Sequence, residues 1–213
     1  MTFADRIAAG RLLGERLREL GLDDPVVLGL PRGGVIVAAE VAAALDAPLD
    51  IVVARKLGVP WQPELAFGAV APGTVVLQRD VLDGIGLRRG DVDAAIAEQT
   101  AQLAPLAARY RSGRAQIPLL GRTAVIVDDG LATGATATAA VRSIRGHGPA
   151  RIVLAVPVGA AQTVAALGRE ADQVVCLEAR SVFRAVGLHY DDFATTRDEE
   201  VIERLAARQS ERA

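Results

Sequence analysis

Cysteine, aromatic residues and long apolar runs are scarce in this chain. A single cysteine among 213 residues, Cys176, excludes an intramolecular disulfide and a cysteine-rich zinc site. The longest strongly apolar runs, such as residues 151–158, are far shorter than the roughly 18 residues that a membrane-spanning helix needs. No charged and apolar leader opens the sequence. We therefore expect a cytoplasmic protein without a membrane partner.

No charge of one sign dominates either. The chain has 24 basic and 26 acidic residues, for a formal net charge of −2. A general nucleic-acid-binding protein would carry a basic excess, so we expect no nucleic-acid partner. Lysine is nearly absent, and Lys56 is the one example. The length suits one domain, which can bury roughly 70% of its unfolded surface without disulfides.

Helical and strand-like segments alternate along the chain, which is typical of an α/β domain with a mostly parallel sheet flanked by helices. Continuous apolar runs predict strands buried on both faces, at residues 26–30, 50–54, 122–129, 151–158 and 173–179. Helical spacing predicts helices over 4–20, from PRGG to Leu45, over 91–112 with an interruption near Pro105, and from Asp198 onward. In the irregular region of residues 55–80, the short apolar stretches 65–71 and 74–78 predict a hairpin.

The junction VIVDDGLATGATAT, residues 125–138, has the composition of a sugar-phosphate site. Asp128 and Asp129 end a predicted strand and could accept hydrogen bonds from ribose hydroxyls. A turn of small and hydroxyl residues follows, and then a helix, whose free amides and positive dipole end attract an anion. A Walker-type loop and a dinucleotide fingerprint are both absent. The alternative is an ordinary turn with a threonine cap and solvated aspartates.

VIVDDGLATGAT resembles the phosphoribosyl diphosphate (PRPP) binding motif of the type I phosphoribosyltransferases. The resemblance implies that Asp128 and Asp129 face the ribose 2′ and 3′ hydroxyls. It also implies that the following loop holds the 5-phosphate through backbone amides and threonine hydroxyls. That loop consists of Gly130, Leu131, Ala132, Thr133, Gly134, Ala135 and Thr136.

Two further segments agree with this family, in its order along the chain. VVLGLPRGG resembles the pyrophosphate loop, which implies that Pro31, Arg32, Gly33 and Gly34 face the diphosphate. ARKLG follows the second predicted strand, where the family often places a basic residue, so Arg55 and Lys56 are candidates. A planar arginine and a point-charge lysine could share one polyanion. The alternatives are a plain turn with a surface arginine and a solvated loop pair.

The resemblance implies a single domain over residues 1–213 with the type I phosphoribosyltransferase (Rossmann-like) fold. The core would comprise residues 22–58 and 118–180. An insertion over 59–117 would hold the hairpin and the long helix, and a small hood would come from the N-terminal helix and 180–213. RKLG and PELAFGAVA also resemble stretches of uncharacterised bacterial phosphoribosyltransferase-domain proteins, over most of residues 1–200.

The reaction implied is a Mg²⁺-dependent glycosyl transfer of nucleotide metabolism, in which a nitrogenous base or amine displaces pyrophosphate from PRPP. Asp128, Asp129, Arg32 and Lys56 would be its catalytic residues. Mg²⁺ would be bound mainly through PRPP, so no protein ligand to a metal is named. The partners would be PRPP and an unidentified base, and the chain would form a homodimer.

The acceptor is not determined by these motifs. Enzymes acting on hypoxanthine or guanine usually carry an acidic residue just before Thr-Gly, where this chain has Ala132. A weak base pocket is predicted from Phe183, Tyr190 and Trp61, whose rings could stack on a base. The alternative is that Phe183 and Tyr190 pack on the core and Trp61 lies on a surface hairpin.

Two other functions of the fold are open. One is a regulator that senses PRPP or a nucleotide and keeps the fold without catalysing a reaction. The presence of Asp128, Asp129, Arg32 and Lys56 favours catalysis instead, because a sensor could have lost the contacts to the diphosphate. A PRPP synthetase would need a duplicated architecture, for which 213 residues are few.

Overall fold

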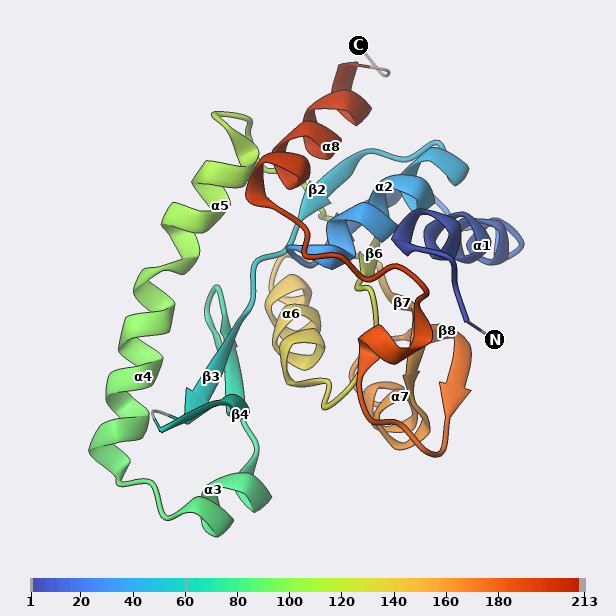
Figure 1. Ribbon diagram of the computed structural model, residues 1–213. Helices are drawn as coiled ribbons and strands as arrows, with labels where there is room; N and C mark the ends of the chain where they lie inside the picture. The colour runs from blue at the N-terminus through green and yellow to red at the C-terminus, as the bar shows by residue number, and fades with distance from the viewer. Residues whose placement is uncertain (1, 60, 211–213) are drawn as a thin grey trace.

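A parallel sheet forms the centre of the computed structural model, which describes residues 2–59 and 61–210. Its five strands have the order β2-β1-β6-β7-β8 within these residues (Figure 1). They are β1 (Pro25–Gly29), β2 (Leu49–Ile51), β6 (Thr123–Val127), β7 (Arg151–Ala160) and β8 (Gln173–Arg180). The predicted α/β class with a central parallel sheet is confirmed, although β2 is shorter than predicted.

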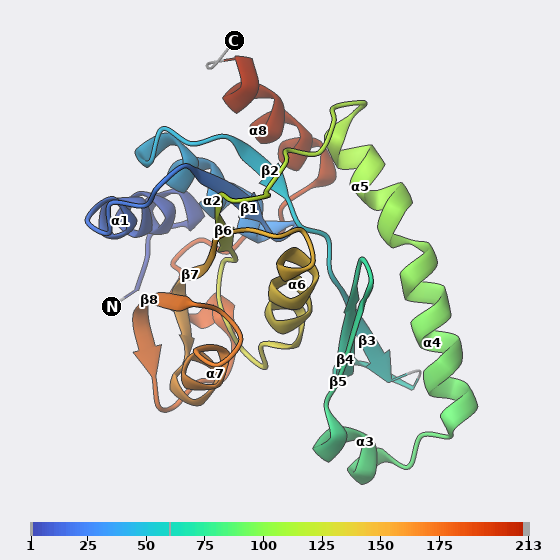
Figure 2. The ribbon, with the colours of Figure 1, turned by 180° about the vertical axis from the view of Figure 1, so that it is seen from behind.

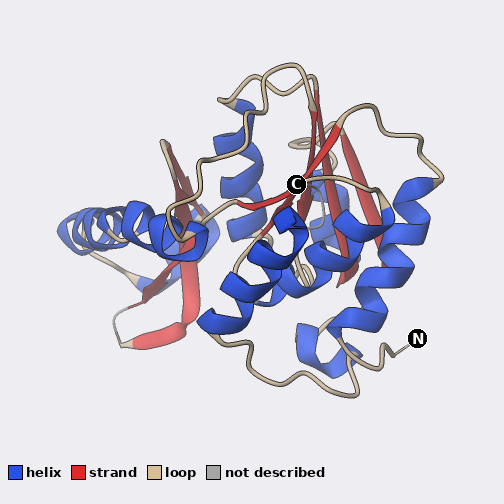
Figure 3. Ribbon diagram, turned by 90° about the horizontal axis from the view of Figure 1, so that it is seen from above, coloured by secondary structure: helices blue, strands red, loops and turns tan. Residues whose placement is uncertain are grey.

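Helices cover both faces of this sheet (Figure 3). They are α1 (Arg6–Arg18), α2 (Gly33–Ala44), α6 (Ala135–Arg145), α7 (Ala161–Leu167) and α8 (Asp198–Ser210). Alternate residues of a strand face opposite sides. Thus Val125 packs in a cluster with α1, α2 and α8, while Ala124 and Ile126 pack with α6 and α7. Two buried faces explain why the strand residues are almost all apolar.

A second, antiparallel sheet lies to one side of the first (Figure 2). Within the described residues it has the strands β3 (Arg55–Val59), β4 (Gln62–Ala71) and β5 (Thr74–Leu77), in that order. The predicted hairpin is therefore present as β4 and β5. Arg55 and Lys56 begin β3, so they belong to this sheet and not to a loop.

A helical arm runs along the second sheet and consists of α3 (Arg79–Ile85), α4 (Arg89–Ala101) and α5 (Leu103–Arg111). The predicted helix over 91–112 is divided at Gln102. Pro105 has no amide to donate to the carbonyl of Ala101, so the helix is interrupted one turn before the proline. Nothing in the sequence pattern predicted α3, which buries none of its residues.

The N-terminal segment lies against the segment that follows β8. The segment after β8 contains a short 3₁₀ helix, η1 (Val186–His189). Phe3 donates its amide to the carbonyl of His189 at 2.9 Å, and Asp191 donates to the carbonyl of Phe3 at 2.8 Å. The N-terminal segment therefore pairs with residues 189–192. No helix among the described residues is long and apolar enough to span a membrane.

The sheet has a topological switch point between β1 and β6. From β1 the chain continues to β2 on one side, and from β6 it continues to β7 and β8 on the other. Ligands of open parallel sheets bind at such a point, outside the carboxyl ends of the strands. The segments after β1 and β6 are the two loops that the sequence motifs predicted.

Candidate active site

The loops after β1 and β6 lie against each other. The amide of Leu30 donates to the carbonyl of Val127 at 2.9 Å, and the Pro31–Arg32 peptide is cis. The first turn of α2 then passes beside the acidic pair. A Cβ atom at Gly33 would lie 2.0 Å from Asp129 Oδ2. Glycine is required there because any side chain would displace that carboxylate.

A cavity of about 310 Å³ opens between the two loops. Most of the residues predicted for the site line it: Pro31, Arg32, Gly33, Lys56, Asp128, Asp129, Gly130, Leu131, Ala132, Thr133, Gly134 and Thr136. Val186 of η1 completes the lining from the hood side. Gly34, Arg55 and Ala135, also predicted, lie outside this lining. One cavity therefore unites both predicted loops, the acidic pair and Lys56.

The first turn of α6 begins at the edge of the cavity, where Thr136 lines it. Gly134 has a φ of +75°, a left-handed conformation that glycine adopts without strain. The first helical bond runs from the amide of Thr138 to the carbonyl of Gly134 at 2.8 Å. The amides of Ala135, Thr136 and Ala137 precede that bond and have no acceptor within the helix. Free amides at a helix start are of the kind that can bind an anion.

Leu131 differs from the role that the family resemblance implied for it. Its amide donates to the carbonyl of Val158 at 2.9 Å, and its carbonyl accepts from Ala160 at 2.9 Å. The side chain is also buried. Leu131 therefore fixes the loop to β7, and its amide is not available to a phosphate. Thr163 supports the loop by donating its hydroxyl to the carbonyl of Ala132 at 2.7 Å.

Burial makes the acidic pair difficult to ionise. It raises the pKa of Asp128 well above its usual range, and the charge of Asp129 adds to the effect. Burial also raises the pKa of Asp129, although the Arg6 guanidinium opposes this. The Lys56 ammonium lowers the pKa of both carboxyls. An incoming cation or a set of hydroxyl donors would favour the ionised pair.

A stability prediction follows from the raised pKa of Asp128. The folded protein holds this proton more tightly than the unfolded chain, so stability falls as the pH rises from about 4 through the folded-state pKa. Asp128→Asn cannot ionise and still presents an oxygen to the amide of Asp129, 2.9 Å away in the native protein. We expect its Tm to exceed the wild-type value by a few degrees at pH 8, and by less at pH 5. Melting curves showing no pH-dependent difference would contradict the burial argument.

Arg6 is the functional residue that sequence reasoning missed. Its Nε donates to Asp129 Oδ2 at 2.8 Å, and the two side chains are 12% and 16% exposed. Its Nη1 donates to the carbonyl of Ala194 at 2.8 Å, and its Cζ lies 3.8 Å from the ring centroid of Phe193. Arg6 thus links the second carboxylate to the hood. No local signal marks it, because it is 123 residues from Asp129 in an arginine-rich chain.

The aromatic residues predicted as a base pocket do not line the cavity in the described structure. Tyr190 is 6% exposed, packs against Phe3 and Phe193, and donates its hydroxyl to the carbonyl of Asp129 at 2.6 Å. Its ring is therefore not available for stacking, and its role is to support the acidic loop. Phe183 stacks on His189 at 5.0 Å, and Trp61 is 64% exposed at the turn between β3 and β4.

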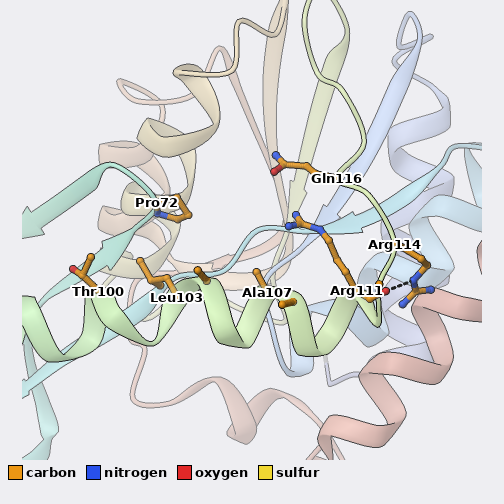
Figure 4. Close-up of a pocket in the computed structure, with 10 residues that line it drawn as sticks. Pro72, Thr100, Leu103, Ala107, Arg111, Arg114 and Gln116 are labelled. Carbon is orange, nitrogen blue, oxygen red and sulfur yellow. Dashed lines mark hydrogen bonds between the residues drawn. The ribbon is translucent and has the colours of Figure 1, made fainter.

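A larger apolar cavity of about 550 Å³ lies along α5 (Figure 4). Pro72, Leu103, Ala107 and Arg111 are among the residues that line it. Its lining contains no residue of the two glycine-containing loops and no carboxylate. It therefore offers no carboxylate to ribose hydroxyls, and the guanidinium of Arg111, one of its cations, is already bound to Asp50 at 2.9 Å. The cavity at the switch point is the candidate site.

The fold and these two loops define a phosphoribosyl transferase domain, and the comparison with known families agrees. The family model for the phosphoribosyl transferase domain matches residues 4–192. The chain therefore belongs to this family and has its type I fold, as the two loop motifs predicted.

Relatives of the chain agree with this assignment. "Putative phosphoribosyl transferase Rv0571c" and "Putative phosphoribosyl transferase MT0597", from two strains of Mycobacterium tuberculosis, are each 54% identical to it over 201 residues. The match covers 94% of this chain and 45% of each relative, so the chain spans about half the length of these proteins.

Solved structures share the architecture. TT1426 from Thermus thermophilus is 45% identical, with a TM-score of 0.80 over 97% of this chain and 99% of that one. AQ2163 from Aquifex aeolicus is 13% identical, with a TM-score of 0.50 over 82% of this chain and 72% of that one. The second likeness concerns the fold alone.

Proposed function

We propose that the chain binds PRPP and transfers its phosphoribosyl group to a nitrogenous base or amine, with release of pyrophosphate. The observation that carries this proposal is the single cavity of about 310 Å³ at the switch point. It brings together the start of α6, the Asp128–Asp129 pair, and the cations Arg32 and Lys56. These groups match a phosphate, a pair of hydroxyls and a diphosphate respectively.

Each part of PRPP has a counterpart in the cavity. The 5-phosphate would accept hydrogen bonds from the amides around Thr133 and Thr136 and gain from the helix dipole. The ribose hydroxyls would donate to the two carboxylates. Arg32 and Lys56 would face the diphosphate, where a charge-assisted hydrogen bond from arginine is strong and directional.

The proposed transfer breaks one bond and forms one. The C1–O bond of PRPP breaks with its electron pair going to the diphosphate oxygen. The lone pair of the acceptor nitrogen forms the new C1–N bond, and the proton of that nitrogen passes to water. Arg32 and Lys56 would stabilise the negative charge that develops on the leaving group. The buried carboxylates would stabilise the positive charge that develops on the ribosyl carbon.

The donor set of the cavity suits Mg²⁺, which prefers oxygen ligands. Among the described residues, no group of three or more His, Cys, Asp and Glu side chains could hold a metal ion alone. Mg²⁺ would therefore take most of its ligands from PRPP and water, with Asp128 and Asp129 as the protein oxygens available in the cavity. Bound there, it would offset the charge of the departing diphosphate.

The side of the cavity toward the hood would receive the acceptor. Val186 lines it there. Ala132, which lines the same cavity and has no proton-accepting group in its side chain, would be the loop residue nearest the acceptor. This combination disfavours a 6-oxopurine, whose enzymes usually place an acid at that position. A neutral base or amine that loses its proton to water fits better.

Turnover of PRPP with a panel of acceptors tests the proposal. Purines, pyrimidines and small amines would be incubated with the protein and Mg²⁺·PRPP, and pyrophosphate release would be measured. We expect at least one acceptor to give stoichiometric release that Asp129→Asn suppresses. Tight PRPP binding without release for any acceptor would indicate the non-catalytic regulator instead.

A further inference from the structure

Each carboxylate of the acidic pair has one oxygen bound within the protein and one oxygen left for a ligand. Asp128 Oδ1 accepts from the amide of Asp129 at 2.9 Å, and Asp129 Oδ2 accepts from Arg6 Nε at 2.8 Å. Within the described residues, nothing donates to the other two oxygens, Asp128 Oδ2 and Asp129 Oδ1. Two carboxylate oxygens therefore remain to accept from the two hydroxyls of a ribose.

The start of α2 closes on the two bound oxygens. A Cβ atom at Gly33 would lie 2.0 Å from Asp129 Oδ2, and one at Gly34 would lie 3.0 Å from Asp128 Oδ1. The bound oxygens thus lie against the backbone of α2, while both aspartates line the cavity. A carboxylate that turned about its Cβ–Cγ bond would carry its free oxygen away from the ligand. The orientation of each carboxylate therefore matters for binding.

The two carboxylates are held by donors of different kinds. The donor to Asp128 is the backbone amide of the next residue, so the loop orients this carboxylate by itself. The donor to Asp129 is the side chain of Arg6, which comes from a segment 123 residues away. The orientation of Asp129 therefore depends on one distant side chain, and that side chain can be changed without altering the loop.

Arg6 is fixed in place by the hood. Its Nη1 donates to the carbonyl of Ala194 at 2.8 Å, and its Cζ lies 3.8 Å from the ring centroid of Phe193. The Phe193 ring packs on Tyr190 at 5.0 Å, and Tyr190 donates its hydroxyl to the carbonyl of Asp129 at 2.6 Å. A planar guanidinium can donate from Nε and Nη1 and stack on a ring at the same time. The hood thus holds the backbone of Asp129 through Tyr190 and its carboxylate through Arg6.

Arg6 is not among the described residues that line the cavity, so it would act on a ligand through Asp129. We propose that Arg6 is a positioning residue that gives the cavity its selectivity for a sugar phosphate with both ribose hydroxyls. By holding Oδ2 of Asp129, it directs Oδ1 of the same carboxylate at one hydroxyl. This inference rests on the proposed function, since it concerns the ribose of PRPP.

Titration calorimetry with ribose 5-phosphate, 2-deoxyribose 5-phosphate and 3-deoxyribose 5-phosphate tests this selectivity, at one Mg²⁺ concentration. In the wild type, removal of the hydroxyl that faces Asp129 should weaken binding by about tenfold or more, because a hydrogen bond to a charged acceptor is lost. Arg6→Gln should reduce this factor to about threefold or less, because the carboxylate loses the donor that orients it. Arg6→Lys keeps the charge and a donor, so its factor should exceed that of Arg6→Gln.

A second background shows whether Arg6 acts through Asp129. The discrimination that Asp129→Asn abolishes identifies the hydroxyl concerned, and adding Arg6→Gln to this variant should change the discrimination no further. The double variant also leaves no unpaired buried charge, so it keeps the test decisive if Arg6→Gln alone does not fold. A ratio of two affinities is independent of the folded fraction, because both ligands titrate the same folded molecules.

Arg11→Gln is the matched control. It lies on the same helix, removes the same charge, and changes a side chain that is 69% exposed. We expect wild-type discrimination between the three sugar phosphates in this variant.

Wild-type discrimination in Arg6→Gln would overturn the proposal, as would equal wild-type affinities for the three sugar phosphates. A further loss of discrimination in the double variant, relative to Asp129→Asn, would also overturn it. A separate titration of the wild-type protein with Mg²⁺·PRPP distinguishes these failures from that of the proposed function. PRPP binding with unchanged discrimination in Arg6→Gln would remove the role of Arg6 alone. Absence of PRPP binding would contradict the proposed function and this inference with it.

Discussion

Gly33→Ala should reduce the affinity for PRPP by about a hundredfold or more. The new methyl group would lie 2.0 Å from Asp129 Oδ2 and 2.7 Å from Arg6 Nε. These atoms belong to a largely buried ion pair, so they can retreat only by breaking it. The Asp129 carboxylate, which is proposed to bind the ribose, would then leave its position. Breaking the ion pair would also leave a buried charge without its partner, which typically costs about 3–5 kcal/mol. We expect lower thermal stability along with the loss of binding.

Gly90→Ala is the matched control for this substitution. Gly90 lies in the first turn of α4, and a Cβ atom there meets nothing within 4 Å. Alanine has the higher helix propensity, so the control should be as stable as the wild type or more stable, by up to about 1 kcal/mol. Calorimetric titration with Mg²⁺·PRPP and a melting curve for each variant provide the comparison. Similar PRPP affinities for the two variants would contradict the close approach of α2 to the acidic loop.

Asp129→Asn should weaken PRPP binding at least tenfold without unfolding the protein. A tenfold loss corresponds to about 1.4 kcal/mol, which is within the range for a hydrogen bond to a charged acceptor. Arg6 donates to Oδ2, which leaves Oδ1 as the oxygen that would accept from a ribose hydroxyl. The variant loses the negative charge that makes this bond strong.

The control for Asp129→Asn is Asp83→Asn, at an exposed carboxylate on α3. Both changes remove one negative charge, so they have the same effect on the net charge and on the general attraction of an anion. Only the change at the site should alter PRPP affinity. Unchanged affinity in Asp129→Asn, with a normal melting curve, would remove the ribose from its proposed place.

The parts of the fold that the sequence predicted are those that depend on burial and local chemistry. Strands such as β6 and β7 were recognisable because helices cover both their faces, which requires continuous apolar runs. The interruption of the helical arm followed from Pro105, whose missing amide acts on the nearest turn. The two loops after β1 and β6 were recognisable because their glycines and small residues resemble the motifs of the family.

The parts that were missed depend on contacts between distant segments. Residues 52–54 continue the apolar run of β2, yet the chain leaves the sheet after Ile51 and begins β3 at Arg55. In the sequence, Arg6 is indistinguishable from a surface arginine, because its role depends on contact with Asp129, 123 residues further along the chain. Tyr190 was predicted to be near the site, but its hydroxyl supports the loop backbone instead of its ring binding a base.

The most direct test of the account is a calorimetric titration of the wild-type protein with Mg²⁺·PRPP, alongside Mg²⁺·ribose 5-phosphate. The two ligands share the phosphate and the ribose hydroxyls, and PRPP adds the diphosphate that Arg32 and Lys56 are proposed to bind. We expect saturable binding of both, with PRPP at least tenfold tighter. Equal affinities would contradict the assignment of the diphosphate loop, and binding of neither would contradict the proposed function of the cavity.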